Sequence, residues 1–308
     1  NGKPEFEGLV AEILPALDLL QYYLKNSAKI LRPKNIKLSL LKYRRSRIEY
    51  APLGVVAVIS PWNYPFLLPF GEIIPILMAG NSVVFKPSEV TPLVGLELQR
   101  LFESLELPPH LIQTVIGDGN LGQAIIEQKP NKIFFTGSVA TGKKVMSQAA
   151  QHLIPVNLEL GGKDAMIVCE DADLDYATSA ALWGAFSNSG QVCASTERLL
   201  VHESIAPKFK SLLKQKAQEL SANELGSITF EKQKLVYESQ ILEAKKAGAD
   251  FVFGGNFSVD RTRLEPTLVT GPGIEALSIY NEETFGPVVA LTTFKTDQEA
   301  ITKANQSR

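Results

Sequence analysis

The sequence contains few cysteines and histidines, and it has no long block of like charge. Its two cysteines, Cys169 and Cys193, are too few for a disulfide framework, which favours a reducing compartment and a cytoplasmic protein. The three histidines, at positions 110, 152 and 202, share no metal-ligand spacing, so we expect no metal site. The net charge is −2 at pH 7, so nothing indicates a nucleic-acid partner.

No segment of the sequence is typical of a signal peptide or a membrane span. Residues 1–12 are polar and charged, whereas a signal peptide has an apolar core. Residues 53–71 carry no charge and are nearly long enough to cross a bilayer, but Pro61, Pro65 and Pro69 would each disrupt a helix. We expect no transmembrane segment, and peripheral association with a membrane stays compatible with the sequence.

The length of 308 residues suggests two domains, and the pattern of apolar residues divides the chain into four parts. Residues 5–29 have helical apolar spacing, which makes 1–33 a helical part of the first domain. Residues 36–50 alternate between apolar and polar side chains, so we expect a half-exposed hairpin within 34–52. The first α/β domain then covers 53–160 and the second 161–308.

Short β-branched runs alternate with helical segments over most of the chain, which predicts parallel strands covered on both faces. The fold class is therefore α/β, with a doubly wound, Rossmann-like first domain. In that domain we expect strands at 54–60, 82–85, 111–116 and 132–135, and helices at 66–79, 91–105, 119–128 and 140–151. In the second we expect strands at 166–169, 199–201 and 251–253, an edge strand at 288–294, and helices at 173–187 and 204–219.

Two glycine motifs match nucleotide-binding patterns only in part. Gly117–Gly122 fits the dinucleotide fingerprint, but the next strand ends without the acidic residue that holds a ribose, which favours a plain glycine turn. Gly137–Lys143 nearly spells a phosphate loop, but Lys144 replaces the hydroxyl residue that would hold Mg²⁺. A glycine turn at a helix N-terminus can still bind a phosphate, and the nucleotide need not be ATP.

Five further segments occur in a fixed order along the chain. They are Pro61-Trp62-Asn63-Tyr64-Pro65, Lys86-Pro87-Ser88-Glu89, Glu159-Leu160-Gly161-Gly162-Lys163, Gly190-Gln191-Val192-Cys193 and Glu282-Glu283-Thr284-Phe285-Gly286-Pro287. In order and separation they resemble the motifs of the hydrolytic, NAD(P)-dependent aldehyde dehydrogenase superfamily, over nearly the whole chain. The resemblance implies a cofactor domain at 53–160, a catalytic domain at 161–308 and an oligomerisation hairpin that joins homodimers or homotetramers.

The resemblance implies three catalytic residues whose chemistry suits aldehyde oxidation. Cys193 corresponds to the nucleophile, since a thiolate makes the aldehyde carbon tetrahedral before a hydride leaves. Asn63 corresponds to the donor that stabilises the resulting oxyanion. Glu159 corresponds to the general base that activates water against the thioester. Cys169, in an apolar strand, is expected to be a small buried hydrophobe.

The resemblance also implies a site for NAD or NADP. Lys86 and Glu89 correspond to residues that hold the adenosine ribose, and Glu283 and Phe285 to those that hold the nicotinamide ribose and ring. A carboxylate at 89 favours NAD because it would repel a 2′-phosphate, although Lys86 could offset the repulsion. The full predicted set is Ile59, Pro61, Trp62, Lys86, Ser88, Glu89, Gly117, Gly137, Ser138, Gly142, Leu160, Gly161, Glu283 and Phe285.

Two small residues suggest the size of the aldehyde. Relatives that act on small aldehydes place bulky aromatic residues eight positions after the oxyanion asparagine and six before the cysteine. Here these positions hold Gly71 and Ser187, which favours a long or bulky apolar aldehyde: fatty, retinal-like or carotenoid-derived. The alternative is that other residues refill the space. The predicted substrate tunnel comprises Tyr64, Leu67, Leu68, Gly71 and Ser187.

Three other functions remain to be weighed. A dehydrogenase that passes the acyl group to coenzyme A is disfavoured by Glu159, which points to water as the acceptor. A P-loop-like nucleotide-binding protein is disfavoured by Lys144. A relative that has lost catalysis is disfavoured because Cys193, Glu159 and Asn63 are all present.

Overall fold

The computed structural model describes residues 2–220 and 225–307, which form two compact units. The first unit is Phe6–Leu160, and the second runs from Gly161 onward and includes residues 2–5. Each unit has a five-stranded sheet with helices on both faces, so the expected α/β class is confirmed.

The sheet of the first unit is entirely parallel, with the strand order β5-β4-β3-β6-β7. The order reverses at β3, which is the arrangement of a doubly wound, Rossmann-like sheet. Four strands match the β-branched runs, and the fifth, β7, was missed by the sequence interpretation. The strands are β3 (Val55–Ile59), β4 (Ser82–Lys86), β5 (Ile112–Thr114), β6 (Lys132–Gly137) and β7 (Val156–Leu160).

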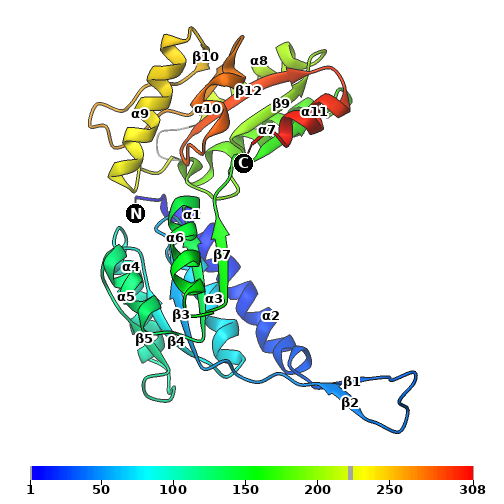
Figure 1. Ribbon diagram of the computed structural model, residues 1–308. Helices are drawn as coiled ribbons and strands as arrows, with labels where there is room; N and C mark the ends of the chain where they lie inside the picture. Colours follow the sequence, from blue (N-terminus) through cyan, green and yellow to red (C-terminus); the bar gives the residue numbers. More distant parts are fainter. Residues whose placement is uncertain (1, 221–224, 308) are drawn as a thin grey trace. The chain divides into compact units, whose positions relative to one another are not determined.

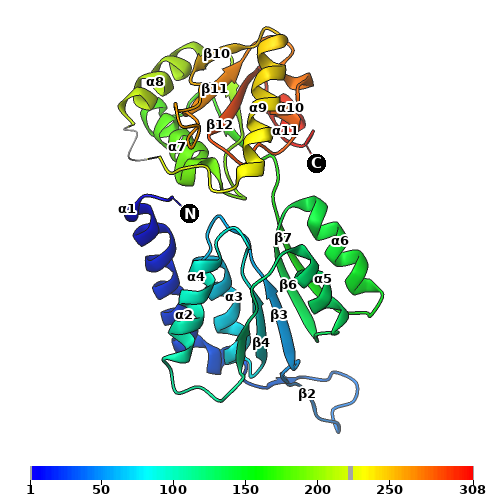
Figure 2. The same ribbon diagram turned by 90° about the vertical axis from the view of Figure 1, so that its left-hand side faces the viewer.

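Side chains alternate across this sheet and bury one hydrophobic cluster on each face. Val56, Val58 and Phe85 face one cluster, whereas Ala57 and Ile59 face the other. The first cluster includes α3 (Leu67–Met78) and α4 (Pro92–Glu103), and the second includes α5 (Gly119–Glu127) and α6 (Val139–Ala150). Figure 2 shows these two helix layers on either side of the strands.

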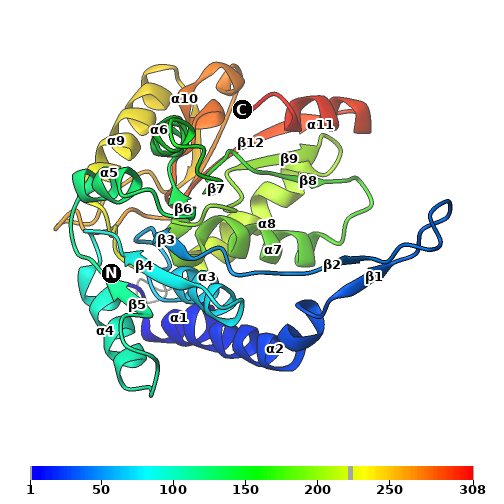
Figure 3. The same ribbon diagram turned by 60° about the horizontal axis from the view of Figure 1, so that its bottom comes forward.

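The N-terminal helical segment packs on α3 through Ala16 and Leu20 (Figure 3). It consists of α1 (Glu5–Gly8), the π-helical turn η1 (Leu9–Ile13) and α2 (Leu14–Ile30), close to the predicted extent. Glu12 of η1 is buried, and its carboxylate accepts hydrogen bonds from the backbone N–H groups of Phe66 (2.8 Å) and Leu67 (3.2 Å). It therefore caps the start of α3 from outside, an interaction typically worth about 1 kcal/mol.

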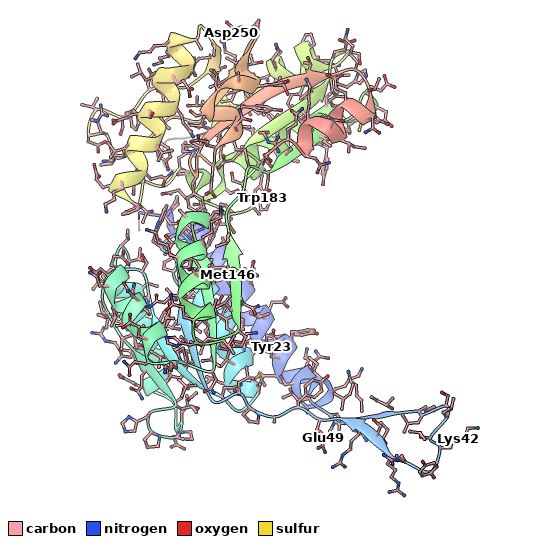
Figure 4. The ribbon with its side chains drawn as sticks, in the orientation of Figure 1. Tyr23, Lys42, Glu49, Met146, Trp183 and Asp250 are labelled. Carbon is pink, nitrogen blue, oxygen red and sulfur yellow. The ribbon has the colours of Figure 1, made fainter. Side chains whose placement is uncertain are left out.

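The predicted hairpin is present but shorter than its alternating pattern. Strands β1 (Lys34–Ile36) and β2 (Ser46–Ile48) pair antiparallel and extend away from the helices and sheet of the first unit (Figure 1). Lys42 lies at the tip and Glu49 nearer the base (Figure 4).

The sheet of the second unit has the order β10-β11-β12-β9-β8, with only β10 antiparallel to its neighbour. The prediction that 288–294 forms an edge strand is wrong: β12 lies in the centre, because it pairs with both β9 and β11. Strand β11 was not predicted. The strands are β8 (Ala165–Val168), β9 (Arg198–His202), β10 (Asp250–Phe253), β11 (Thr267–Thr270) and β12 (Val288–Phe294).

Helices cover both faces of the second sheet as well (Figure 2). One face carries α7 (Leu174–Phe186) and α8 (Ala206–Glu219), and the short 3₁₀ turn η2 (Ser187–Gly190) follows α7. The other face carries α9 (Glu231–Lys246), which was not predicted, the 3₁₀ turn η3 (Ile274–Ala276), α10 (Ser278–Asn281) and α11 (Asp297–Ala304).

The expectation for Cys169 is wrong. Strand β8 ends at Val168, so Cys169 lies just beyond it, at the start of the turn that leads to α7, and it is exposed. Separately, no helix within residues 2–220 and 225–307 has both the length and the apolar character needed to cross a membrane.

Candidate active site

The predicted cofactor residues of the first unit gather at one edge of its sheet. Ile59, Lys86, Gly137 and Leu160 are the last residues of β3, β4, β6 and β7. The carboxyl ends of parallel strands share an edge, and ligands of open α/β sheets bind outside that edge, where the strand order reverses. The fold thus brings together residues that lie up to a hundred positions apart in the sequence.

Lys86 has a buried side chain whose ammonium group makes only long hydrogen bonds. Only 4 % of the residue is exposed, and its aliphatic carbons lie beside Gly122 of α5. The ammonium group contacts Glu89 Oε2 at 3.3 Å and the carbonyl of Pro87 at 3.4 Å, both long for charged hydrogen bonds. Glu89 is exposed, and Ser88 accepts a hydrogen bond from the Val90 N–H. Lys86 and Glu89 can therefore reach a hydroxyl-rich ligand at the sheet edge.

Helix α6 begins at the same edge. Ser138 is its N-cap, and its hydroxyl accepts a hydrogen bond from the Thr141 N–H at 3.3 Å. Gly142 lets Leu160 pack closely on the first turn, because a Cβ at 142 would lie 2.6 Å from a Leu160 methyl. This packing holds the positive end of the helix dipole at the edge, where it can bind a phosphate.

The structure distinguishes the two glycine motifs from the nucleotide-binding patterns that they resemble. Strand β6 ends at Gly137 and α6 begins at Val139, which leaves no loop to wrap around a triphosphate. Lys143 is exposed and lines a groove of about 700 Å³ between α5 and α6 rather than the turn. At the other motif, Asp118 caps α5 with its own carboxylate, and Gly117 makes room for Leu121. A carboxylate thus takes the place that a phosphate would need there.

Asn63 lies between β3 and α3, in the segment that also holds Pro61 and Trp62. It is buried, with 2 % of its surface exposed, while Pro61 and Trp62 are half-buried. Because Glu12 fixes the start of α3 four residues later, the segment is held at both ends. Glu159 stands on the edge strand β7, is exposed, and pairs in register with Thr136 of β6.

Cys193 lies in the second unit, after a turn with an unusual backbone. Asn188, Ser189 and Gly190 all have positive φ angles of 49°, 55° and 68°. A Cβ at Gly190 would collide with the Gly286 carbonyl, so only glycine permits this approach. Left-handed residues other than glycine are strained, and such strain persists only where surrounding contacts hold it.

Gln191 supplies these contacts. Its side-chain nitrogen donates to the carbonyls of Asn188 (3.0 Å) and Ser227 (3.2 Å), and its oxygen accepts from the Thr229 N–H (2.9 Å). Ser189 adds a hydrogen bond to the Gly226 carbonyl at 2.9 Å. The segment before Cys193 is therefore tied to the chain that leads into α9, and the thiol projects from a fixed backbone.

The surroundings of Cys193 favour the neutral thiol. The residue is exposed, but partial burial of its sulfur raises the pKa of the thiol, and the Glu283 and Asp164 carboxylates raise it further. Hydrogen bonding from the backbone N–H groups of Cys193 and Ala194 acts in the opposite direction. A nucleophilic role for Cys193 would therefore require deprotonation of the thiol as part of its activation.

We expect alkylation of Cys193 by iodoacetamide to be slower near pH 7.5 than that of N-acetylcysteine, because less thiolate is present. The rate should still be rising at a pH where the reference thiol has levelled off. Measuring the rates in a Cys169→Ser background isolates Cys193, since both cysteines are exposed. A plateau at lower pH than the reference would contradict the prediction.

A buried ion pair positions the loop that carries Glu283 and Phe285. Lys163 Nζ lies 2.6 Å from Glu197 Oε2, and both side chains are 2 % exposed. The Glu197 carboxylate also accepts hydrogen bonds from the Thr284 and Phe285 N–H groups, each at 2.8 Å. Burial lowers the pKa of Lys163, and the Glu197 charge offsets part of that effect.

Phe285 is held in a left-handed conformation, with φ of 54°. Its N–H donates to Glu197, and its carbonyl accepts from the Tyr237 hydroxyl at 2.7 Å. Two buried side chains thus fix both backbone groups of one strained residue. Glu197 and Tyr237, like Lys163, were not assigned roles from the sequence.

Glu283 lies against the backbone of the Gly161-Gly162 pair. A Cβ at Gly161 would coincide with the Glu283 carboxylate, and the Gly162 N–H donates a hydrogen bond to that carboxylate. Burial raises the pKa of Glu283 to about 7, and nearby Glu197 contributes in the same direction. Near neutral pH this group can therefore accept a hydrogen bond from a ribose hydroxyl or exchange its proton.

Gly161→Ala should displace the Glu283 carboxylate while leaving the fold nearly unchanged, because the colliding atoms end a flexible side chain. We expect NAD(P)+ affinity to fall by roughly tenfold, the effect of losing one or two hydrogen bonds. Gly162→Ala is a matched control, because its Cβ would meet only Asp164 Oδ1 at 3.4 Å. Equal effects of both variants in a calorimetric titration would contradict the assignment.

The predicted tunnel residues of the first unit lie at the start of α3. Tyr64, Leu67 and Leu68 are half-buried, and a Cβ at Gly71 would lie 3.2 Å from a methyl of Leu19 in α2. Gly71 therefore faces α2, and a larger residue there must displace Leu19. In the second unit, the half-buried Ser187 donates its hydroxyl hydrogen to the Trp183 carbonyl at 2.6 Å.

Of the three residues predicted to be catalytic, Asn63 and Glu159 belong to the first unit and Cys193 to the second. The same holds for the candidate cofactor residues, since Gly161, Glu283 and Phe285 belong to the second unit. No cluster of histidine, cysteine, aspartate and glutamate in the described part of the chain could hold a metal ion.

Solved structures with related folds cover nearly the whole chain. The NAD⁺ complex of an aldehyde dehydrogenase from Bacillus cereus is 33 % identical, with a TM-score of 0.94 over 100 % of this chain and 64 % of that one. Betaine aldehyde dehydrogenase from Staphylococcus aureus, also with NAD⁺, is 34 % identical, with a TM-score of 0.86 over 95 % of this chain and 61 % of that one.

Sequence relatives give the same assignment. The chain is 42 % identical to 4,4′-diapolycopene aldehyde oxidase of Methylomonas sp, over 100 % of its own length and 59 % of the relative's. It is 38 % identical to peroxisomal aminoaldehyde dehydrogenase 1 of Pisum sativum, over 99 % and 63 %. It thus spans about three fifths of these relatives. The aldehyde dehydrogenase family model matches residues 1–308, and the chain belongs to that family.

Proposed function

We propose that the protein oxidises an aldehyde to the carboxylic acid with NAD(P)⁺, through a thioester on Cys193. One observation carries the proposal: Cys193 is exposed next to a segment that Gln191 holds rigid, in a family member that also keeps Asn63 and Glu159. An exposed thiol on a fixed backbone suits a nucleophile, whereas a cysteine that serves packing would be enclosed in a core.

Each catalytic residue has one task in this reaction. Cys193 loses its proton to solvent, and its thiolate forms a C–S bond to the carbonyl carbon; Asn63 and the Cys193 backbone N–H donate hydrogen bonds to the oxyanion. NAD(P)⁺, when bound, accepts the hydride that leaves this carbon. Glu159 then takes a proton from water as the water oxygen attacks the thioester, and cleavage of the C–S bond releases the acid and restores the thiolate.

The residues at the first sheet edge and at Glu283 fit a dinucleotide. The Lys86 ammonium group makes only long hydrogen bonds within the protein, so it can donate a hydrogen bond to a ribose hydroxyl. The start of α6 presents backbone N–H groups to a phosphate. NAD⁺ is bound in the related structures, and one relative, a putative succinate-semialdehyde dehydrogenase of Mycolicibacterium smegmatis, carries NADP(+) in its name. Glu89 favours NAD here because its charge would repel a 2′-phosphate.

We further propose that the aldehyde is long, apolar and bulky, such as an apocarotenal. Ser187 supplies little side-chain volume at its predicted tunnel position, and Gly71 has no side chain at its own, although a methyl of Leu19 in α2 approaches the space beside it. The name of the Methylomonas relative refers to a carotenoid-derived aldehyde, which supports the same class. Aminoaldehyde and betaine aldehyde enzymes are also among the relatives, so a cationic aldehyde is the competing candidate.

The test of both proposals is an activity assay of the full-length protein with NAD⁺ or NADP⁺. The aldehydes compared are an apocarotenal, a fatty aldehyde, an aminoaldehyde and acetaldehyde. The absorbance of the reduced cofactor measures turnover. We expect the largest kcat/KM for the apolar aldehydes with NAD⁺. Preference for the aminoaldehyde or acetaldehyde would reject the substrate class. Absence of cofactor reduction with every aldehyde would reject the activity.

The hairpin is proposed to join a second copy of the chain. Its apolar side chains are open to solvent, with Leu40 91 % and Tyr43 79 % exposed, and its strand edges are bare among the described residues. We expect the full-length protein to form a dimer or tetramer in light scattering. Leu40→Lys with Tyr43→Lys should shift the mass toward the monomer; a monomeric wild type would contradict this prediction.

A further inference from the structure

Glu72 is a charged residue that the proposed mechanism does not use. It lies on α3, half-buried, and faces the end of β6, where the Thr136 hydroxyl donates to its Oε1 at 3.3 Å. Its second oxygen, Oε2, is enclosed and has no hydrogen-bond partner among the described residues. A buried carboxylate oxygen without a partner is costly, so this group is expected to hold a proton or a bridging water.

Glu72 shares one face of the sheet with Glu159. On β6, Phe134 packs toward the α3 side and Phe135 toward the α6 side, so Thr136 faces α3. On β7, Leu158 and Leu160 pack toward α6, so Glu159 also faces the α3 side, and it pairs in register with Thr136. Thr136 therefore stands between the two carboxyl groups.

A third polar residue extends this row. Ser60 follows Ile59, which pairs with Phe135, so Ser60 stands beside Thr136 on the same face. Its hydroxyl is enclosed and has no partner among the described residues. Two enclosed oxygens without a partner, one on Ser60 and one on Glu72, thus lie near Thr136. Ser60 is also three residues before Asn63 in the sequence. Polar groups arranged in this way suit ordered water.

The charges around Glu72 favour exchange of a proton near neutral pH. Burial raises the pKa of Glu72 to about 7, the Thr136 hydrogen bond opposes this, and the Glu159 charge raises the pKa further. The other elements packed on α3 add little charge at this point. Glu12 is engaged at the start of α3, Lys132 lies at the far end of β6 over Phe134, Lys86 belongs to the opposite face, and α2 exposes Asp18, Lys25 and Lys29.

We propose that Glu72 is a positioning residue for Glu159. Glu72 receives the proton that Glu159 has taken from water, and Glu72 then releases this proton to solvent. This inference rests on the proposed function. Water gives one proton to the Glu159 carboxylate and its oxygen to the acyl carbon. That proton then moves through the Thr136 hydroxyl or a bridging water to the Glu72 carboxylate, so Glu159 regains its charge for the next turnover.

The first test compares Glu72→Gln with wild type and with Thr136→Val over pH 6–9. Glu72→Gln should keep the burst of reduced cofactor and KM, lose roughly tenfold in steady-state turnover at pH 7.5, and lose the ionisation near pH 7 from the kcat profile. Thr136→Val should move that ionisation to higher pH, because the hydrogen bond that lowers the Glu72 pKa is gone. A Glu72→Gln profile that matches wild type would overturn the inference.

The second test needs no activity and separates this inference from the proposed function. Infrared difference spectra of wild type minus Glu72→Gln should show a carboxyl band that titrates near pH 7. In a Glu159→Gln background the same band should titrate at lower pH, because a neighbouring negative charge is removed. An unchanged midpoint would overturn the coupling of the two groups even if aldehydes are oxidised. Failure of all aldehydes with the coupling intact would reject the proposed function alone.

Discussion

Cys193→Ala should lower NAD(P)⁺-dependent aldehyde oxidation by roughly 10⁴-fold or more, because no other side chain can form the thioester. The structure explains why the substitution should abolish the chemical step while leaving the fold and cofactor binding intact. The backbone around residue 193 is held by Gln191 and Ser189, and neither contact involves the thiol. Stopped-flow absorbance should therefore show no burst, whereas a fluorescence titration should give nearly the wild-type cofactor affinity.

Cys169→Ala provides the matched control, since Cys169 is also exposed but lies at the start of the turn after β8. It should retain full activity and the full burst. Substantial turnover by Cys193→Ala, or a comparable loss in Cys169→Ala, would mean that Cys193 is not the nucleophile.

The elements that sequence predicted well are those with strong local patterns. Runs such as Val55–Ile59, in which Val56 to Ile59 are all buried, are rich in β-branched residues, so their strand character is visible without any partner. Strand β7 was missed because Val156–Leu160 alternates like the half-exposed edge strand that it is. The central place of β12 depends on its pairing with β9, some ninety residues earlier in the chain, which no local pattern encodes.

The candidate site divides in the same way. Residues predicted to act through their own chemistry, such as Cys193 and Glu159, stand in short motifs, and those motifs are what the sequence prediction rests on. Residues that act by holding others were missed, because their partners are remote in sequence: Glu197 bonds to the N–H of Thr284 across 87 positions, and Thr136 to Glu72 across 64. Lys163 was visible within its motif, but its role became clear only from the buried pair.

Glu159→Gln should separate the two halves of the reaction. We expect a burst of about one reduced cofactor per active site followed by turnover slowed by ~10²–10⁴-fold, because thioester formation survives and water is no longer deprotonated. The substitution is conservative in shape, and residue 159 is exposed on an edge strand, so the fold should not change.

Acid quenching followed by mass spectrometry should detect the acyl group on Cys193. Addition of hydroxylamine should restore turnover, because a strong nucleophile needs no general base. Loss of the burst together with the steady state would show that Glu159 acts before hydride transfer, and full turnover would show that another group activates water.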